Sequence, residues 1–382
     1  MGPLTGVRIL EFEAIGPGPF CGMMLADMGA DVLLVDRQQD ARLGFGRIRN
    51  IDVMFRGRRS VTLDLKSPDG VQAALLLSDR ADVVIEGNRP GVMERLGLGP
   101  DTLLARNPRL VYGRMTGWGQ DGPLAARAGH DINYIALSGA LHAIGRADEP
   151  PVPPLNLVGD FGGGGMLLAF GIVCALLEAK ASGTGQVVDA AMVEGSALLA
   201  TMFAGMRASG QWRDERGANF LDSGAPWYGC YETKDGKYVA IGPVEPKFYA
   251  QLLARIGLDE HSMPAQYDRD RWPAMRETFK AAFLARTRDE WSALLQDHDV
   301  CYSPVLSFPE AQTHPHAIAR DGYIDVGGID QPAPAPRFSR TPGEVRGAPP
   351  ERGAMGREAL TDWGFDNDEI DRLIKLGTGI SS

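Results

Sequence analysis

The stretch VRILEFEAIGPGPFCGMMLADMGADVLLVD, residues 7–36, decides the fold. It runs from a short apolar segment through a turn rich in glycine and proline into a segment of helical length, and it ends in a second apolar segment. Short apolar segments on either side of a helix are typical of a βαβ unit, whose two strands pair in parallel. We therefore predict a strand at 7–12, a helix at 19–30 and a parallel strand at 31–36.

The same order recurs further along the chain. Strand-like segments lie at 58–65, 82–87 and 109–117, and a helical segment lies at 67–81. Repeated βαβ units build a doubly wound parallel sheet with helices on both faces. The N-terminal part is therefore predicted to be a large α/β domain of Rossmann-like architecture.

The glycines after the first strand match a dinucleotide-binding fingerprint poorly. Gly16 and Gly18 fit the first two glycines of G-x-G-x-x-G, but Cys21 replaces the third, and two prolines remove backbone donors. Asp36, at the end of the second strand, could bind a ribose. The broken fingerprint argues against a nicotinamide cofactor.

The second half of the chain predicts a smaller α+β domain. Residues 228–243 alternate like a β-hairpin around an Asp-Gly turn, and helical segments follow at 246–258 and, twice, within 271–300. Between the two domains, residues 185–210 predict a strand and then one long apolar helix. A proline-rich segment at 331–353 precedes a short capped helix near the end.

These segments predict the domain boundaries. The large domain comprises residues 1–190 together with 325–382, and the small domain comprises residues 225–315. Residues 191–224 form a helical and extended linker, and residues 316–324 form a return linker. A length of 382 residues fits two domains.

Composition predicts a soluble globular protein of a reducing compartment. Hydrophobic residues make up 44% of the chain and charged residues 23%, as in globular proteins. We expect no signal peptide, and we expect the longest apolar stretch, 162–180, to be a buried helix rather than a membrane span. The four cysteines have neither metal-ligand spacing nor the pattern of a disulfide framework. The C-terminal GISS differs from the peroxisomal Ser-Lys-Leu signal, so we expect a cytoplasmic protein without a membrane partner.

The charge distribution leaves one local exception to an acidic protein. A net charge of −10 argues against nucleic acid as a partner. Residues 37–66, however, carry eight cations and only three aspartates, which gives a local net charge of +5 (8 − 3). The cations are Arg37, Arg42, Arg47, Arg49, Arg56, Arg58, Arg59 and Lys66. This basic stretch is either a solvated surface loop or a pocket for a polyanionic small molecule.

Three short motifs carry candidate chemical groups. His130, one of six histidines, stands in GHDINYIALSG, and could be a packed residue, a metal ligand or a base. Asp160 stands before four glycines and a helix in PPLNLVGDFGGGG, either as a simple N-cap or in a site where backbone N–H groups meet an anion. Glu245, between a strand and a helix that starts with proline, is a capping or surface residue unless another group adjoins it.

In their order along the chain, these motifs resemble the family III CoA-transferase (CaiB/BaiF) superfamily, and the resemblance covers nearly the whole sequence. The matching segments are LTGVRILEF, SVTLDLKSPDG, DVVIEGNRPGVMERLGLGP, GRMTGWGQDGP, AGHDINYIALSG, PPLNLVGDFGGGG, SGTGQVVDAAMVEG, GPVEPKFY and WGFDNDEIDRLI. Both branches of the superfamily have an aspartate at the position of Asp160. The racemase branch also has the Gly-His-Asp of residues 129–131 and a glutamate at Glu245, so the chain resembles the racemases.

The resemblance implies inversion of the carbon α to a CoA thioester, between (2R)- and (2S)-2-methylacyl-CoA. Removing a proton from one face and returning one to the other requires two acid/base groups, which we expect to be His130 and Asp160, with Glu245 orienting the imidazole. We expect backbone N–H groups at the helix start after Asp160 to stabilise the enolate, and we expect no metal or other cofactor. The alternative is a CoA-transferase in which Asp160 is a nucleophile, although transferases usually lack His130.

The resemblance also implies a CoA site and an interlocked homodimer. The expected contacts follow the strands of the large domain, and the charges at Lys66 and Arg95 could also be ordinary surface charges near helix ends. The expected CoA-binding residues are Arg37, Leu63, Asp64, Leu65, Lys66, Gly87, Asn88, Arg89, Arg95, Gly129, His130, Asp131, Ile132, Asn133 and Tyr134. The acyl chain stays open among fatty 2-methylacyl, sterol side-chain and arylpropionyl groups.

Overall fold

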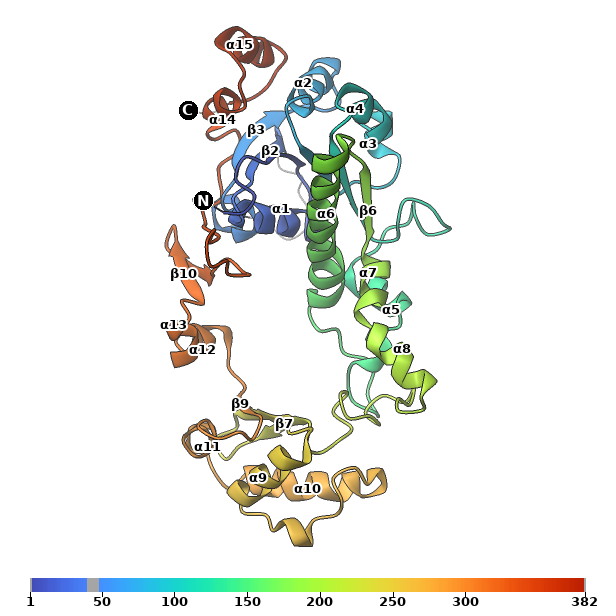
Figure 1. Ribbon diagram of the computed structural model, residues 1–382, viewed down its shortest axis with the longest axis vertical. Coiled ribbons are helices and arrows are strands. Elements are labelled where there is room, and N and C mark those ends of the chain that lie inside the picture. Colours follow the sequence, from blue (N-terminus) through green and yellow to red (C-terminus); the bar gives the residue numbers. More distant parts are fainter. Residues whose placement is uncertain (1, 40–47, 381–382) are drawn as a thin grey trace. The chain divides into compact units, whose positions relative to one another are not determined.

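The computed structural model describes residues 2–39 and 48–380, so the predictions for Arg42 and Arg47 lie outside the described residues. The chain divides into two compact units (Figure 1). The first unit is made of residues 1–138, 155–199 and 318–382, and the second of residues 139–154 and 200–317. Residues 139–154, which the predicted boundaries place in the large domain, are thus grouped with the second unit.

A six-stranded parallel sheet forms the centre of the first unit, with strand order β3-β2-β1-β4-β5-β6. The order reverses between β1 and β4, as in a doubly wound fold. Both faces of the sheet are covered by apolar side chains, which is why its strands are apolar almost throughout. The strands are β1 (Arg8–Phe12), β2 (Asp31–Arg37), β3 (Arg59–Leu63), β4 (Val83–Glu86), β5 (Val111–Thr116) and β6 (Val187–Ala191). The predicted α/β fold with a parallel sheet is confirmed.

The helices of the first unit pack on the two faces of this sheet (Figure 1). One face is covered by helices that include α2 and, from the end of the chain, α14 and α15, whose Trp363 and Leu373 are fully buried. The other face is covered by α1 and α6. The helices are α1 (Pro17–Asp27), α2 (Pro68–Ser78), α3 (Val92–Arg95), α4 (Pro100–Arg106), α5 (Asp131–Leu137), α6 (Met166–Ser182), α7 (Met192–Leu199), α14 (Gly356–Asp362) and α15 (Asn367–Lys375). The predicted capped helix near the end is α15, in which the Asp366 side chain accepts a hydrogen bond from the Glu369 amide.

The helix α6 differs from the buried helix that the sequence predicts. Together with the turn before it, it forms a segment, Leu157–Ser182, that is long and apolar enough to cross a membrane by length and composition alone. One face of α6, which includes Leu168 and Ile172, packs against the sheet. The opposite face leaves Met166, Phe170, Val173 and Leu177 between 41% and 72% exposed. Only part of the helix is therefore buried within the chain.

The long helix predicted after the sixth strand is divided into two helices. The helix α7 ends at Leu199 and α8 (Thr201–Ala208) starts after Ala200, whose backbone leaves the helical region. The break falls at the boundary between the two units, so α7 belongs to the first unit and α8 to the second. Periodicity alone did not reveal this boundary, because both helices are apolar.

The second unit contains the predicted hairpin and helices. Strands β7 (Gly229–Glu232) and β8 (Tyr238–Ile241) are antiparallel, and Gly236 adopts a positive φ in the turn between them. A third strand, β9 (Tyr302–Pro304), pairs with β8 and was not predicted. The helices α9 (Pro246–Ile256), α10 (Trp272–Phe283) and α11 (Arg288–Leu295) pack their aromatic side chains against this sheet.

Shorter elements complete the chain. The helices α12 (Phe308–Gln312) and α13 (Pro315–Ala319) follow β9. Strands β10 (Tyr323–Val326) and β11 (Ile329–Pro332) form an antiparallel hairpin just before the extended proline-rich segment.

Candidate active site

The expected site residues of the first unit follow the carboxyl ends of the parallel strands. Arg37 ends β2, residues 63–66 follow β3, and residues 87–89 follow β4. Ligands of doubly wound folds bind at this edge, where the strand order reverses. The reversal here lies between β1 and β4, and the loops after these strands touch, since a Cβ on Gly87 would meet the Ala14 Cβ at 3.0 Å.

The Gly-His-Asp turn, residues 129–131, is shaped by Tyr134. The Tyr134 hydroxyl donates a hydrogen bond to the Gly129 carbonyl, and the ring leaves no space for a side chain at Gly129, where a Cβ would lie 2.7 Å from it. The His130 amide donates to Asn133 Oδ1 at 3.0 Å, and the Asn133 amide donates to the His130 carbonyl at 2.8 Å. These two bonds start α5 directly after His130, whose side chain is exposed.

The Asp131 side chain points to the segment that carries Asp160. Asp131 is 7% exposed, and its Oδ1 accepts hydrogen bonds from the amides of Gly159 and Asp160, both at 2.8 Å. The second oxygen, Oδ2, is buried without a hydrogen-bond partner among the residues that the structure describes. A Cβ on Gly159 would lie 2.4 Å from Oδ1, so this approach requires glycine.

Asp160 lies inside a helical turn rather than at its cap, which corrects the sequence prediction. Residues Leu157–Gly165 form a π-helical segment that continues directly into α6. The glycines in it allow close packing, since a Cβ on Gly163 would lie 2.6 Å from the Ser196 amide of α7. The amides of Gly159 and Asp160 are bonded to Asp131, so they are not free donors for an enolate oxygen. The enolate donors expected after Asp160 are other amides than these two, and their role stays a prediction.

The surroundings of Asp160 favour its protonated form. Burial raises the pKa of this carboxyl, and the neighbouring charge of Asp131 raises it further, whereas the hydrogen bond from Asn156 and the charge of His130 lower it. Asn156 Nδ2 donates to Asp160 Oδ2 at 3.0 Å. On the β1 side, a Cβ on Gly16 would lie 3.2 Å from Asp160 Oδ2, which places this carboxyl beside the loop at the strand reversal. The charge of His130 therefore acts on Asp160 at the edge where a ligand is expected.

Asn156 was missed by the sequence analysis. Its signal was a lone amide in an otherwise apolar segment, four residues before the aspartate. A residue four positions away is a neighbour on a helix, so the amide was within reach of Asp160 once this segment proved helical.

Several cations of the basic stretch are neutralised by carboxylates of the protein itself. This finding supports neither of the two interpretations from sequence, a solvated surface loop or a pocket for a polyanionic small molecule. Four of its arginines pair with carboxylates of the first unit, at N–O distances of 2.5 to 2.9 Å. The pairs are Arg49–Asp36, Arg56–Asp27, Arg58–Glu11 and Arg59–Asp31. In the Arg58–Glu11 pair both side chains are 0% exposed. A guanidinium that is paired and buried in this way is not available to a phosphate.

Other cations near the strand ends remain exposed. These are Arg37, Lys66, Arg89 and Arg95. Arg352, from the segment before α14, donates to the Arg37 carbonyl at 2.8 Å and so fixes the end of β2. Leu63 is buried in the core, so its side chain is not available to a ligand.

The loop after β4 is fixed by Glu86, which also forms a buried ion pair. Glu86 accepts a hydrogen bond from the Asn88 amide at 2.7 Å and pairs with Arg114 at 3.0 Å. Arg114 also reaches Glu94 at 2.8 Å. The sequence analysis did not single out Glu86 or Arg114, because charged residues within apolar strands give no pattern of their own.

Glu245 belongs to the second unit, where it immediately precedes α9 and is exposed. Its charge raises the pKa of the Tyr267 hydroxyl and of the Cys301 thiol, although burial is the larger cause for both. The predicted pairing of Glu245 with His130 stays a prediction.

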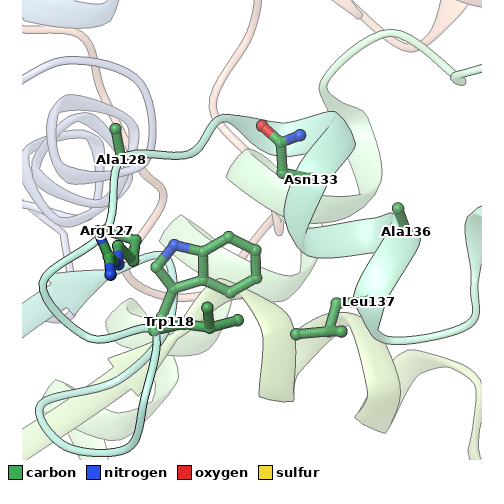
Figure 2. Close-up of a pocket in the computed structure, with 7 residues that line it drawn as sticks. Trp118, Arg127, Ala128, Asn133, Ala136 and Leu137 are labelled. Carbon is green, nitrogen blue, oxygen red and sulfur yellow. The ribbon is translucent and has the colours of Figure 1, made fainter.

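An open pocket of about 490 Å³ lies between the loop after β5 and α5. Figure 2 shows the Trp118 indole reaching from that loop toward α5, which presents Asn133, Ala136 and Leu137. Leu124, Arg127 and Ala128 complete the lining. Neither His130 nor Asp160 is among the described residues that line it.

Within the described part of the chain, no three histidines, cysteines or acids form a group that could hold a metal ion.

A doubly wound sheet with exposed cations near its carboxyl edge, and a histidine and an aspartate on two hydrogen-bonded turns, make up an α/β fold with a candidate site for an anionic ligand. The chain belongs to the CoA-transferase family III, whose family model matches residues 4–355. It is 45% identical over 372 residues to mouse alpha-methylacyl-CoA racemase, with 97% of this chain and 96% of that protein covered, and 42% identical to the human alpha-methylacyl-CoA racemase with the same coverage. A solved CAIB/BAIF family protein from Brucella suis superposes with a TM-score of 0.82 over 95% of this chain and 99% of that one, at 25% identity.

Proposed function

We propose that this protein is an isomerase that interconverts (2R)- and (2S)-2-methylacyl-CoA thioesters. The observation that carries this proposal is that Asp131, directly after His130, accepts a hydrogen bond from the Asp160 amide at 2.8 Å, which joins the two turns beside the strand reversal. The high identity to mouse and human racemases over nearly the whole chain supports the reaction and the substrate class.

The reaction needs two groups that exchange roles. One group removes the proton from C2 on one face, and the electron pair of the C–H bond moves into the thioester to give an enolate. The other group then donates a proton to C2 on the opposite face, which inverts the centre. His130 and Asp160 suit these roles because an imidazole is a common acid and base in enzymes, and because burial raises the pKa of the Asp160 carboxyl above its ordinary value. Only protons move, so the proposed chemistry requires no cofactor.

The CoA part of the substrate is assigned to the carboxyl edge of the sheet. The exposed Arg37, Lys66, Arg89 and Arg95 supply positive charge there for its phosphates. The neutralised arginines of the basic stretch pair with carboxylates of the strands, and these pairs are proposed to hold the strand ends in place. Glu245 is proposed to orient the His130 imidazole, as a carboxylate does in a catalytic triad.

We propose a homodimer, interlocked as in the related family, in which a second copy covers the exposed face of α6. The residues Met166, Phe170, Val173 and Leu177 recur at intervals of four, three and four positions, so they form one continuous apolar stripe. Such a stripe on a long helix is typical of a buried contact between chains. The four cysteines are free thiols, three of them exposed, which fits the proposed cytoplasmic location.

Sedimentation velocity tests the dimer with Leu177→Glu, since Leu177 is 72% exposed. The unchanged chain is expected to sediment as a dimer and the variant as a monomer. Glu178→Gln, on the same helix but outside the stripe, is the matched control and should stay dimeric. A wild-type monomer that floats with phospholipid vesicles would instead assign the stripe to a membrane.

The function is tested by α-proton exchange in D₂O, with a single enantiomer of a 2-methylacyl-CoA and no acceptor acid. Deuterium at C2 and the appearance of the other enantiomer are expected, and both should be lost in His130→Ala and Asp160→Ala. No exchange, with acyl transfer only when a free carboxylate is added, would instead identify a transferase in which Asp160 is the nucleophile.

A further inference from the structure

The Asp131 carboxylate has no role in the proton transfers proposed above, yet it occupies an unusual place. Among the residues that the structure describes it has no cationic partner within ion-pair distance, and it accepts a hydrogen bond from the backbone of Asp160, one of the two groups proposed to transfer protons. Burying a charge without compensation is costly, so a carboxylate in this position requires an explanation. We propose that Asp131 is a positioning residue, which fixes the π-helical turn of Asp160 and keeps that carboxyl able to hold a proton. This inference rests on the proposed racemase function.

The positioning part follows from the two hydrogen bonds to Oδ1. A π-helical segment leaves the first amides of the turn without partners in the helix, and two of these amides belong to Gly159 and Asp160. Asp131 Oδ1 accepts from both at 2.8 Å. Because Asp131 directly follows His130, a single side chain links the backbone of one proton-transfer group to that of the other. The spacing of His130 and Asp160 is therefore fixed through Asp131.

The electrostatic part follows from the groups that face Asp160. On α5 these are the negative charge of Asp131 and, just before the helix, His130; Asn156 faces it from its own segment. The neighbours from α1 and α7 are uncharged: Gly16 lies beside the Asp160 carboxyl, Phe20 packs on the Phe161 ring at 4.7 Å, and the backbone of Ser196 meets the glycines. Tyr134, whose pKa is raised to about 12 by burial and by Asp160, stays neutral, and Arg89 acts on it in the opposite sense. Asp131 is thus the one negative charge among the described neighbours of Asp160.

Asp131 and Asn156 consequently act in opposite directions. The Asp131 charge disfavours an ionised Asp160, whereas the Asn156 amide donates to Oδ2 and favours it. A group that must act as both acid and base needs a pKa near the working pH. We infer that the balance between these two neighbours sets that pKa.

The test is a ¹³C NMR titration of protein labelled at the aspartate γ-carbons, in which the Asp160 signal is assigned by its loss in Asp160→Asn. In Asp131→Asn the titration of Asp160 is expected to move to lower pH, because the variant keeps an oxygen for the two amides but removes the charge. In Asn156→Ala it should move to higher pH. Asp101→Asn, on the exposed surface of α4, is the control and should leave it unchanged. An Asp160 midpoint that does not move in Asp131→Asn, or moves upward, would overturn the proposal.

The exchange assay separates the positioning part from the charge. Gly159→Ala keeps the Asp131 charge but places a Cβ 2.4 Å from Oδ1, so it should displace the carboxylate from the two amides. Its kcat is expected to fall at least tenfold with little change in KM, and this variant also keeps the proposal testable if Asp131→Asn does not fold. Unchanged kcat in a folded Gly159→Ala would refute the positioning role. Absence of exchange in the unchanged enzyme would refute the racemase function instead, and the NMR titration would still decide the influence of Asp131.

Discussion

The basic stretch and the segments around Asp160 differ in how their charged side chains are paired. In the basic stretch, Arg58 and Glu11 are both fully buried and satisfy each other at 2.7 Å. Around Asp160, and within the described part of the chain, the Asp131 carboxylate is bonded by backbone amides alone and the Asp160 carboxylate by the Asn156 side chain alone. The paired charges lie within the scaffold of the sheet, whereas burial and the charge of Asp131 raise the pKa of the Asp160 carboxyl, which only an amide side chain bonds among the described residues. How the charged side chains are paired therefore distinguishes the structural charges of the sheet from the groups proposed to transfer protons. The number of charges in each region does not make this distinction.

The largest effect should follow from removing an uncompensated group. Asp160→Asn deletes one of the two acid/base groups but keeps an acceptor for Asn156, so the protein should stay folded. A positioned acid/base group contributes roughly 10²- to 10⁴-fold, and we expect the rate of deuterium incorporation at C2 to fall by about 10³-fold. Mass spectrometry of the recovered thioester measures this rate. A loss below about tenfold would mean that Asp160 belongs with the structural charges.

Breaking a compensated pair should affect stability instead. Arg58→Ala leaves Glu11 buried without its partner, which is expected to lower the free energy of unfolding by about 3–5 kcal/mol. Urea denaturation measures the change. The double variant Arg58→Met with Glu11→Leu should recover most of the loss, because no charge is then left buried. Equal destabilisation in single and double variants would argue against the charge as the cause.

Exposed cations at the strand ends should behave as a third class. Arg95→Ala is expected to raise the KM for 2-methylacyl-CoA about tenfold, in line with the 1.5–3 kcal/mol of a hydrogen bond to a charged group, and to leave kcat unchanged. Arg109→Ala provides the matched control, since Arg109 is exposed at the opposite, amino end of β5. Equal KM values in the two variants would remove Arg95 from the CoA site.

The smallest expected effect is the contribution of the Asp160 side chain to the stability of the folded protein. Its pKa is raised in the folded protein, so the stability that it contributes is present below its unfolded pKa and is lost as pH rises through the folded pKa. Asp160→Asn should therefore unfold at a slightly higher temperature than the unchanged protein at pH 7, and the difference should vanish near pH 3. Scanning calorimetry at both values checks the sign. A variant that is less stable at pH 7 would show that the ionised carboxylate is stabilising there.

The parallel sheet could be predicted because its strands are buried on both faces and read as apolar runs such as Val32–Val35. His130, Asp160 and Glu245 could be named because they stand in short motifs. The start of the helix at Leu157 could not, since glycines predict helix ends more often than a π-helical turn. The partners of Arg56 and Arg58 could not be predicted either, because Asp27 and Glu11 lie some thirty to fifty positions away and no local pattern joins them.

The contact between β3 and the C-terminal segment affects how the chain can fold during its synthesis. Thr62 and Gly379 form a β-bridge, and Trp363 and Leu373 fill the core over one face of the sheet. All residues of the second unit leave the ribosome before these. The second unit can therefore finish folding first, while the sheet of the first unit, which contains His130 and Asp160 in segments beside that sheet, waits with one face uncovered. Nascent chains of this protein are thus expected to depend on chaperones until residues 356–380 have emerged.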